Sequence, residues 1–221
     1  MNTLLRLLVI LLPWPLKRWC LVHGFGYTLH PSSRIGLAWV FPRRLVMAAH
    51  ARIGHLTVAK DMDLVALGEH ASIGRLNWIS GYPSGVPPHF AHLPHREPAL
   101  HIGDHAAITN RHLIDCTERV TIGRFTTFAG FRSQILTHSI DLQACRQHAR
   151  PVVIGEYCFV GTACTVLGGA VLPAYSVLGA NSLLNKAFTE THRLYGGVPA
   201  QRLSELDPAM AYFHRSRGYV V

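Results

Sequence analysis

Acidic residues are scarce in this chain of 221 residues, which has 12 Asp and Glu against 21 Lys and Arg. The formal net charge of +9 favours anionic partners, and the candidates are a phosphorylated cofactor, an anionic membrane surface and nucleic acid. No signature of a nucleic-acid-binding module is present, and the aromatic residues are scattered instead of lining a basic stripe. We therefore expect no nucleic acid partner.

Cysteine is also sparse. The five cysteines form no CxxC pair, and they lie at positions 20, 116, 145, 158 and 164. Small buried side chains in the reducing cytoplasm are the role that this pattern favours.

Long apolar runs are absent as well. Residues 4 to 12 are apolar except for Arg6, but this run is far shorter than the about 20 residues that span a hydrocarbon core. No cleavage site of the A-x-A type follows it, which argues against a signal peptide. We expect residues 1–30 to form an apolar N-terminal segment with a helix.

Two interpretations of this segment remain open. In the first, residues 1–20 are an interfacial anchor, with Trp14 and Trp19 beside Lys17 and Arg18 at the level of the lipid headgroups. In the second, the helix packs on the end of the fold or in an oligomer contact, because solenoids commonly carry apolar capping segments.

What the chain does have is a strict period of six. The apolar members are Ile154, Val160, Val166, Leu172, Leu178 and Leu184, and the small residues that follow the first five by four places are Cys158, Cys164, Ala170, Ser176 and Ser182. This period fits neither a helix nor a single strand, and hexapeptide repeats are typical of a parallel β-helix with triangular coils. Residues eighteen apart should stack, as Ile154 on Leu172, Val160 on Leu178 and Val166 on Leu184. Cys158 and Cys164 then lie on different faces, which disfavours a disulfide.

The same period recurs earlier in the chain with interruptions, at Leu67, Ile73 and Ile79, at Ile102, Ile108 and Ile114, and at Ile122 and Phe128. Glycine often follows the core residue directly, which suits a tight turn or a close backbone approach. We predict an all-β fold in which residues 31–186 form one coil stack and residues 187–221 form a C-terminal tail with a short helix. Excursions are expected at 81–98, which is rich in Pro and Gly, and at 139–152.

The order of several motifs resembles the hexapeptide-repeat acyltransferases, and more narrowly the branch with xenobiotic and polysaccharide O-acetyltransferases. The resemblance covers roughly residues 100–203, and the motifs that carry it are Thr137-His138, the run from Val153 to Gly161, Leu178-Gly179-Ala180-Asn181-Ser182, and Tyr195-Gly196-Gly197-Val198-Pro199-Ala200-Gln201-Arg202-Leu203. It implies a left-handed parallel β-helix, a homotrimer, and acetyl-CoA bound in the groove between neighbouring prisms.

The resemblance also implies the site residues. His138 would be the general base that takes the proton of an acceptor hydroxyl as it attacks the thioester, and no metal is needed for this chemistry. Asp141 is expected to orient the imidazole, and Gly161 is expected to be the oxyanion donor and a cofactor contact. Further cofactor contacts are expected from Gly179, Ala180, Lys186 and Arg202, of which the two basic residues suit phosphate.

These observations predict an acetyl-CoA-dependent O-acetyltransferase that modifies a sugar hydroxyl of a cell-envelope polysaccharide or its precursor. The protein is expected in the cytoplasm. The acceptor would be lipid-linked, and the protein peripheral on the inner face of the membrane, if residues 1–20 are an anchor.

Three alternatives stay open. A γ-type carbonic anhydrase shares the fold and binds zinc through three histidines, but His101, His105 and His112 do not keep the required spacing. A metal site at His89-x-x-His92-x-x-His95 has plausible ligands, but it has no companion Cys or carboxylate. A non-catalytic scaffold on the same prism is the third.

Overall fold

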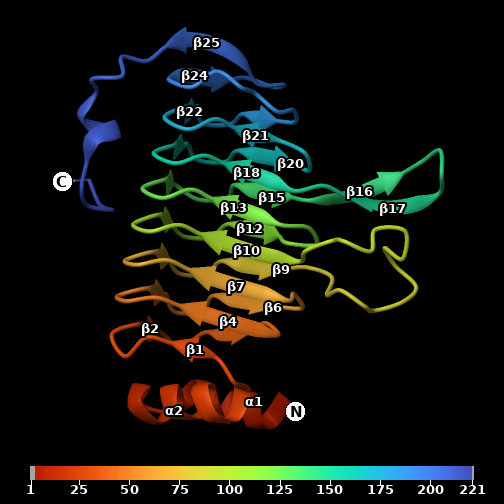
Figure 1. Cartoon of the computed structure of the whole chain (residues 1–221), viewed down its shortest axis with the longest axis vertical. Coiled ribbons are helices and arrows are strands. Elements are labelled where there is room, and N and C mark those ends of the chain that lie inside the picture. Colours follow the sequence, from red (N-terminus) through yellow and green to blue (C-terminus); the bar gives the residue numbers. More distant parts are fainter. Residues whose placement is uncertain (1–2, 221) are drawn as a thin grey trace.

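The six-residue period folds into three sheets that form the faces of a triangular prism (Figure 1). The computed structural model describes residues 3–220. Each short strand ends at a corner of the prism, and the next strand of the chain belongs to the next sheet. This confirms the left-handed parallel β-helix that the sequence predicts.

The strands of each sheet are given in their spatial order. The first sheet contains β1 (Thr28–Leu29), β4 (Arg44–Met47), β7 (Leu64–Leu67), β10 (Ala99–Ile102), β13 (Val120–Ile122), β18 (Val152–Ile154) and β21 (Val171–Leu172). The second contains β2 (Arg34–Ile35), β5 (Arg52–Ile53), β8 (Ser72–Ile73), β11 (Ala107–Ile108), β14 (Thr127–Phe128), β19 (Phe159–Val160), β22 (Val177–Leu178), β24 (Arg193–Gly196) and β25 (Gln201–Glu205). The third contains β3 (Trp39–Phe41), β6 (Val58–Lys60), β9 (Trp78–Ser80), β12 (Leu113–Asp115), β15 (Gln134–Leu136), β20 (Thr165–Leu167) and β23 (Leu183–Leu184). The pairings within these sheets are parallel, except that β25 runs antiparallel to β24.

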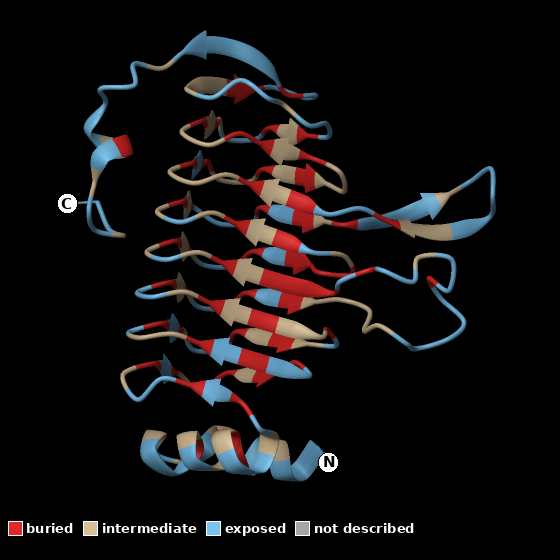
Figure 2. Cartoon of the chain, in the orientation of Figure 1, coloured by how far each residue is buried: buried red, intermediate tan, exposed pale blue. Residues whose placement is uncertain are grey.

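The predicted stacking register is confirmed. Ile154 pairs with Leu172, Val160 with Leu178, and Val166 with Leu184. The five small residues of the period are also inside, since each is at most 2% exposed. Figure 2 shows the resulting column of buried residues along the axis of the prism.

Coils approach so closely at the corners that some positions leave no room for a side chain. A Cβ atom added to Gly155 would lie 2.4 Å from the amide nitrogen of Ala174, and one added to Gly123 would lie 2.4 Å from that of Glu156. This confirms the prediction that glycine after the core residue serves a close backbone approach.

A column of stacked rings runs along one corner. Seven residues with positive φ form it, and neighbouring ring centroids are 4.6 to 5.3 Å apart: His50, His70, His105, Phe125, Tyr157, Tyr175 and His192. The stacking stabilises a left-handed backbone that these residue types seldom adopt.

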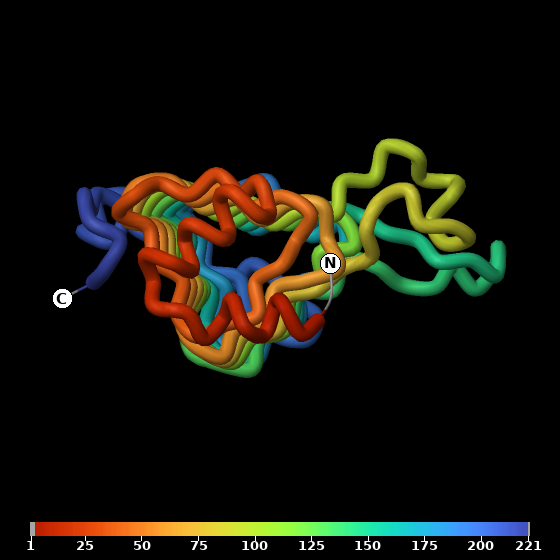
Figure 3. Tube along the Cα trace, turned by 90° about the horizontal axis from the view of Figure 1, so that it is seen from below, coloured from red at the N-terminus to blue at the C-terminus, as the bar shows by residue number. Residues whose placement is uncertain are grey.

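Two helices close the N-terminal end of the prism, α1 (Thr3–Leu11) and α2 (Trp14–Phe25) (Figures 1 and 3). Val9 and Leu21 are buried against the first coil. Lys17 donates to the carbonyl of Gly36 at 2.6 Å, and Arg18 donates to that of Leu29 at 2.8 Å. The cap therefore satisfies carbonyls at the open edge of the stack. Within residues 3–220 no helix is long and apolar enough to cross a membrane.

The coil stack extends beyond the predicted limits of 31–186. It begins at Thr28 in β1, and β24 continues the second sheet to Gly196. The tail then returns along the prism and includes a 3-10 helix, Ala211–His214 (Figure 1).

Both excursions project from the same side of the prism (Figure 1). Residues 81–98 leave after β9 and return at β10. The second excursion is an antiparallel hairpin of β16 (His138–Asp141) and β17 (Arg146–Ala149), where only a loop was predicted.

Candidate functional site

His138 is the first residue of the hairpin, directly after the corner that ends β15. Its side chain is 44% exposed, and its Nδ1 atom lies 2.8 Å from Oδ2 of Asp115. Asp115 ends β12, one coil below, and it pairs with Leu136 across the third sheet. The β-helix thus brings together a histidine and a carboxylate that are far apart in the chain.

The carboxylate of Asp115 is held rigidly. Its Oδ2 atom accepts from the amide and hydroxyl of Thr137 at 2.8 and 2.7 Å and from the His138 amide at 3.1 Å. Its Oδ1 atom accepts from the amide and hydroxyl of Thr117 at 3.1 and 2.6 Å. Burial raises the pKa of Asp115, but the hydrogen bonds from His138, Thr117 and Thr137 outweigh it and lower the pKa to about 2. The group is therefore ionised at neutral pH.

An ionised Asp115 fixes the protonation of its neighbour. Because Oδ2 can only accept, the Nδ1 atom of His138 must carry the hydrogen, which leaves the Nε2 lone pair free. The hydrogen bond to Asp115 raises the pKa of His138, and it outweighs partial burial and the charge of Arg96, which lower it. The ring is thus oriented and made more basic, as a general base requires.

His138 lines a cleft of about 570 Å³ on one side of the hairpin. The cleft is also lined by Asp141, Arg146 and His148 of the hairpin, by Arg150, and by Gly168 and Asn185 of the two coils above. Two arginines and one acidic residue give this cleft a positive balance, which suits an anionic ligand.

The excursion at 81–98 reaches the same histidine. The buried ring of Phe90 meets the His138 ring edge to face, with centroids 6.3 Å apart. The guanidinium of Arg96 lies over Phe90 at 4.5 Å and donates to the carbonyls of Tyr82, Pro83 and Thr117. Arg96 therefore ties the excursion to the coil that carries Asp115.

Asp141 lies in the cleft with His138, but its carboxylate accepts from the amide of Ala144 at 3.0 Å. The carboxylate at the imidazole is Asp115, so the orienting role expected of Asp141 belongs to another residue. A usable signal for Asp115 is present in the repeat. Ile114 and Ile135 are both core residues of the third sheet, and their pairing places Asp115 beside Leu136, the residue before Thr137-His138.

Gly161 lies at a different corner from His138. It follows β19 of the second sheet, and its amide donates to the carbonyl of Leu178 at 2.8 Å. The expected oxyanion donor is thus already engaged in the ladder. Gly179 and Ala180 stack above Gly161 at this same corner, where a Cβ on Gly161 would meet the Ala180 amide at 2.6 Å. The structure places these three residues together and apart from His138 within one chain.

Gly168, and not Gly161, lies at the corner of His138. It follows β20 at the corner directly above His138, it lines the cleft, and a Cβ there would lie 2.6 Å from the carbonyl oxygen of Thr137. Within residues 3–220 its amide has no hydrogen-bond partner. Gly168 was not predicted as a site residue because the hairpin interrupts the eighteen-residue spacing.

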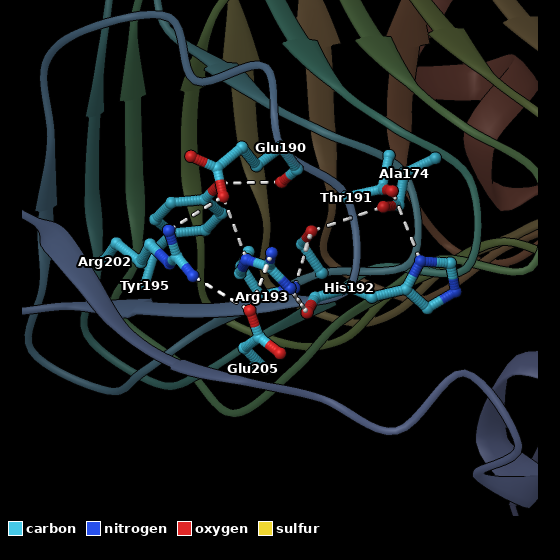
Figure 4. Close-up of polar contacts among 9 residues, drawn as sticks. Ala174, Glu190, Thr191, His192, Arg193, Tyr195, Arg202 and Glu205 are labelled. Carbon is cyan, nitrogen blue, oxygen red and sulfur yellow. Dashed lines mark hydrogen bonds and ion pairs between the residues drawn. The ribbon is translucent and has the colours of Figure 1, made fainter.

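The two basic residues expected at the cofactor phosphates differ in their surroundings. Lys186 is exposed after β23, on the corner that carries His138 and Gly168, and its Nζ atom lies 3.4 Å from Oε1 of Gln201. Arg202 is paired with Glu190 at 3.1 Å and with Glu205 at 3.0 Å in the network of Figure 4. Lys186 is therefore the freer cation.

The histidines considered for zinc have other contacts. Nδ1 of His112 accepts from the amide of Ser133 at 3.2 Å, its Nε2 atom lies 2.9 Å from Oγ1 of Thr109, and burial lowers its pKa to about 4. His105 belongs to the stacked column. In the described part of the chain, no group of three or more His, Cys, Asp or Glu side chains is arranged to hold a metal ion.

A larger cavity of about 930 Å³ lies between the C-terminal tail and the second sheet. Its lining is mainly apolar and includes Phe159, Tyr212 and Phe213. None of the candidate site residues lines it, so the smaller cleft at His138 is the better candidate for chemistry.

No family model and no curated protein sequence matches the chain. Solved structures do match it in fold. A point mutant of AntD, an N-acyltransferase from Bacillus cereus in complex with dTDP and coenzyme A, aligns with a TM-score of 0.52 at 12% identity over 89% of this chain and 92% of that chain. The polysialic acid O-acetyltransferase OatWY aligns at 0.50 and 18% identity, over 81% of this chain and 84% of that chain. The product of the BC4754 gene of Bacillus cereus, assigned as an acetyltransferase, aligns with a TM-score of 0.51 at 19% identity, over 84% of this chain and 81% of that chain. At such identities the likeness shows that the fold is shared.

Proposed function

We propose that this protein is an acetyl-CoA-dependent O-acetyltransferase that transfers an acetyl group to a sugar hydroxyl. The observation that carries the proposal is the hydrogen bond between His138 and Asp115 at the mouth of a cleft in a hexapeptide β-helix. The similar folds of AntD, which was solved with coenzyme A, and of OatWY, an O-acetyltransferase, support this reaction class.

The reaction follows from the arrangement at His138. Nε2 accepts the proton of the acceptor hydroxyl as the oxygen attacks the thioester carbonyl carbon, and Asp115 stabilises the imidazolium that forms. The tetrahedral intermediate then collapses, the bond from carbon to sulfur breaks, and the CoA thiolate takes the proton back from His138. The products are the acetyl ester and CoA, and no covalent enzyme intermediate is needed.

We assign the oxyanion donor to the amide of Gly168. This amide lies at the corner above His138 and borders the cleft, so it could donate to the negative oxygen of the intermediate. Gly161, whose amide bonds to Leu178, keeps a place in the proposal only as part of a cofactor-binding surface.

The cofactor sites support the expectation of a homotrimer. Lys186 lies two coils above His138 on one corner, where it suits a phosphate of acetyl-CoA, but Gly161, Gly179 and Ala180 lie on another corner. A groove between two neighbouring prisms would bring both corners to one ligand, as the proposed homotrimer requires. Arg202 would join this site only by exchanging its carboxylate partners for phosphate.

The acceptor is proposed to be an acidic or phosphorylated carbohydrate of the cell envelope, or its precursor. Arg146 and Arg150 line the cleft with His138, and Arg150 donates to Nε2 of His148 at 3.0 Å, which aligns the side chains. Guanidinium groups recognise carboxylate and phosphate well. A lipid-linked precursor, and a location at the inner face of the membrane, are part of this proposal.

The test is release of CoA from acetyl-CoA with a panel of acidic, phosphorylated and neutral sugars, for wild type and for His138→Ala. Release that depends on an acceptor and is lost in a folded His138→Ala variant is the expected result. Equal release by the variant would overturn the role of His138.

The same preparation separates the two alternatives. Failure to bind acetyl-CoA, measured by calorimetry on the full-length protein, would favour a scaffold. Zinc retained in the purified protein would favour the carbonic anhydrase, which no observation in this chain otherwise supports.

A further inference from the structure

The N-terminal cap presents an apolar face to solvent. On α1 the residues Leu7, Leu8 and Leu11 are 47%, 56% and 72% exposed, and on α2 the residues Leu16 and Trp19 are 56% and 61% exposed. Their spacing of three and four residues places them on one side of each helix. The other side packs on the first coil through Val9, Lys17 and Leu21. Single exposed apolar residues are ordinary, but a continuous group of this kind marks an interaction surface.

This end of the molecule is strongly cationic. The first 60 residues contain no Asp or Glu, and their eight Lys and Arg are Arg6, Lys17, Arg18, Arg34, Arg43, Arg44, Arg52 and Lys60. Arg34, Arg44 and Arg52 are exposed on the first two coils, and Arg34 lies 5.7 Å from the ring of Trp14 in the cap. Arg34 thus lies beside the cap, and Arg44 and Arg52 lie one coil further along the prism.

The charge decides between two occupants. Arg43 and Lys60 are paired with Asp63 and Asp61, but no acidic residue lies within the first 60 residues to pair with the other six cations. A second copy docked end to end would bring two such clusters together, which is unfavourable. An anionic bilayer offers both an apolar interior for the leucines and phosphates for the arginines.

We propose that the outer face of α1 and α2 docks on an anionic phospholipid bilayer. Because both helices lie across the end of the stack, docking sets the prism upright on the membrane (Figures 1 and 3).

Upright docking fixes the height of the site. The third sheet has the order β3, β6, β9, β12 and β15, so His138 lies four coils above the first. The docked cap helices lie within the headgroup layer, so four strand spacings of ~4.8 Å place the imidazole roughly 20 Å above the headgroups. If the proposed transfer to a lipid-linked carbohydrate is correct, the acetylated sugar is several units away from its lipid.

The test is co-flotation of the full-length protein with vesicles of phosphatidylcholine alone or with phosphatidylglycerol. Wild type is expected to float with the anionic vesicles and to be released by salt. Leu8→Ser/Leu11→Ser and, separately, Arg34→Gln/Arg44→Gln should each lower the partition coefficient by about tenfold or more, since each contact group adds independently. The matched controls are Val198→Ser/Leu203→Ser at the opposite end and Arg111→Gln/Arg132→Gln on higher coils, which should bind as wild type does.

Three results would overturn the proposal: no flotation with anionic vesicles, equal flotation with neutral ones, or wild-type binding by both N-terminal variants. An end-to-end dimer that Leu8→Ser/Leu11→Ser abolishes would assign the face to a second copy. The leucine substitutions are on the exposed side, so thermal melting should be unchanged. None of these measurements uses acetyl-CoA, so their failure is independent of the proposed activity, and acetyl transfer to soluble acceptors should persist in both N-terminal variants.

Discussion

Replacing Asp115 with Asn removes the charge that orients and activates His138 while nearly keeping the shape of the side chain. The neutral amide no longer raises the pKa of His138. Its NH2 group must also face either the amide and hydroxyl of Thr117 or those of Thr137, which donate to Asp115 in the wild type. We therefore expect losses in both activity and stability.

The loss of stability follows from the pKa. The pKa of the Asp115 carboxyl is about 2 in the fold against its ordinary value of 3.8, and at about 1.4 kcal/mol per pH unit this corresponds to about 2.5 kcal/mol. A lowered carboxyl pKa stabilises the fold above pH 3.8, and that contribution disappears as the pH falls toward 2. At neutral pH the free energy of unfolding of the Asp115→Asn variant, measured by denaturant titration, should therefore be about 2–3 kcal/mol lower than that of wild type.

The loss of activity should appear in the pH profile of kcat/KM. In wild type the raised pKa of His138 places the ascending limb above the ordinary histidine value of 6.5. In Asp115→Asn the limb should move to lower pH while the plateau falls by about 10²–10⁴, the range of general-base contributions. Because the histidine pKa is raised, its contribution to stability is also largest at low pH and is lost as the pH rises through the folded value.

Asp104→Asn is the matched control. Its carboxylate also accepts a backbone amide, that of Glu69 at 2.8 Å, but it lies at a different corner from His138. This variant should keep the ascending limb and the plateau of the wild-type pH profile of kcat/KM. If Asp115→Asn kept them as well, Asp115 would not be the partner that controls His138.

Three further predictions follow from other contacts. Gly168→Ala should lower kcat more than it raises KM, because its Cβ would lie 2.6 Å from the Thr137 carbonyl and would displace the proposed oxyanion donor; an unchanged kcat would exclude that role. Arg146→Gln should raise KM by about tenfold for an acidic acceptor and leave KM for its neutral analogue unchanged, and a parallel change for both would contradict charge recognition. Burial lowers the pKa of Lys17 to about 8, against 10.5 in the unfolded chain. The free energy of unfolding of wild type should therefore rise by about 3 kcal/mol as the pH increases from 8 to 10.5. The Lys17→Met variant should lack this gain.

The division of the site between two corners has a consequence for assembly. His138, Gly168 and Lys186 follow consecutive strands of the third sheet, whereas Gly161 and Gly179 follow strands of the second. If both sets contact one acetyl-CoA molecule, the active site exists only in the oligomer. A variant that dissociates the proposed oligomer should then lose acetyl-CoA binding without unfolding.

The repeat made most of the fold predictable from sequence. A period of six has one regular arrangement that buries Ile154, Val160 and Val166, so the sequence predicts the stacked pairs. The excursions were also predictable, because Pro and Gly in residues 81–98 cannot continue a coil. The hairpin β16–β17 was not, since its polar residues carry no clear alternation of apolar side chains.

Sequence by itself determined the β-helix and the register of its regular coils, because the period from Ile154 to Leu184 acts locally and repeats without interruption. The tertiary structure showed the partner of His138, which the alignment of Ile114 with Ile135 only indicates. Asp115 reaches it from the coil below across a spacing altered by irregular corners, whereas the nearby Asp141 folds back onto its own hairpin. The tertiary structure also decided how the N-terminal helices lie: Lys17 and Arg18 donate to the first coil, and the leucines face outward. The sequence does not decide this, because the face that a helix turns to solvent depends on what its other face can pack against.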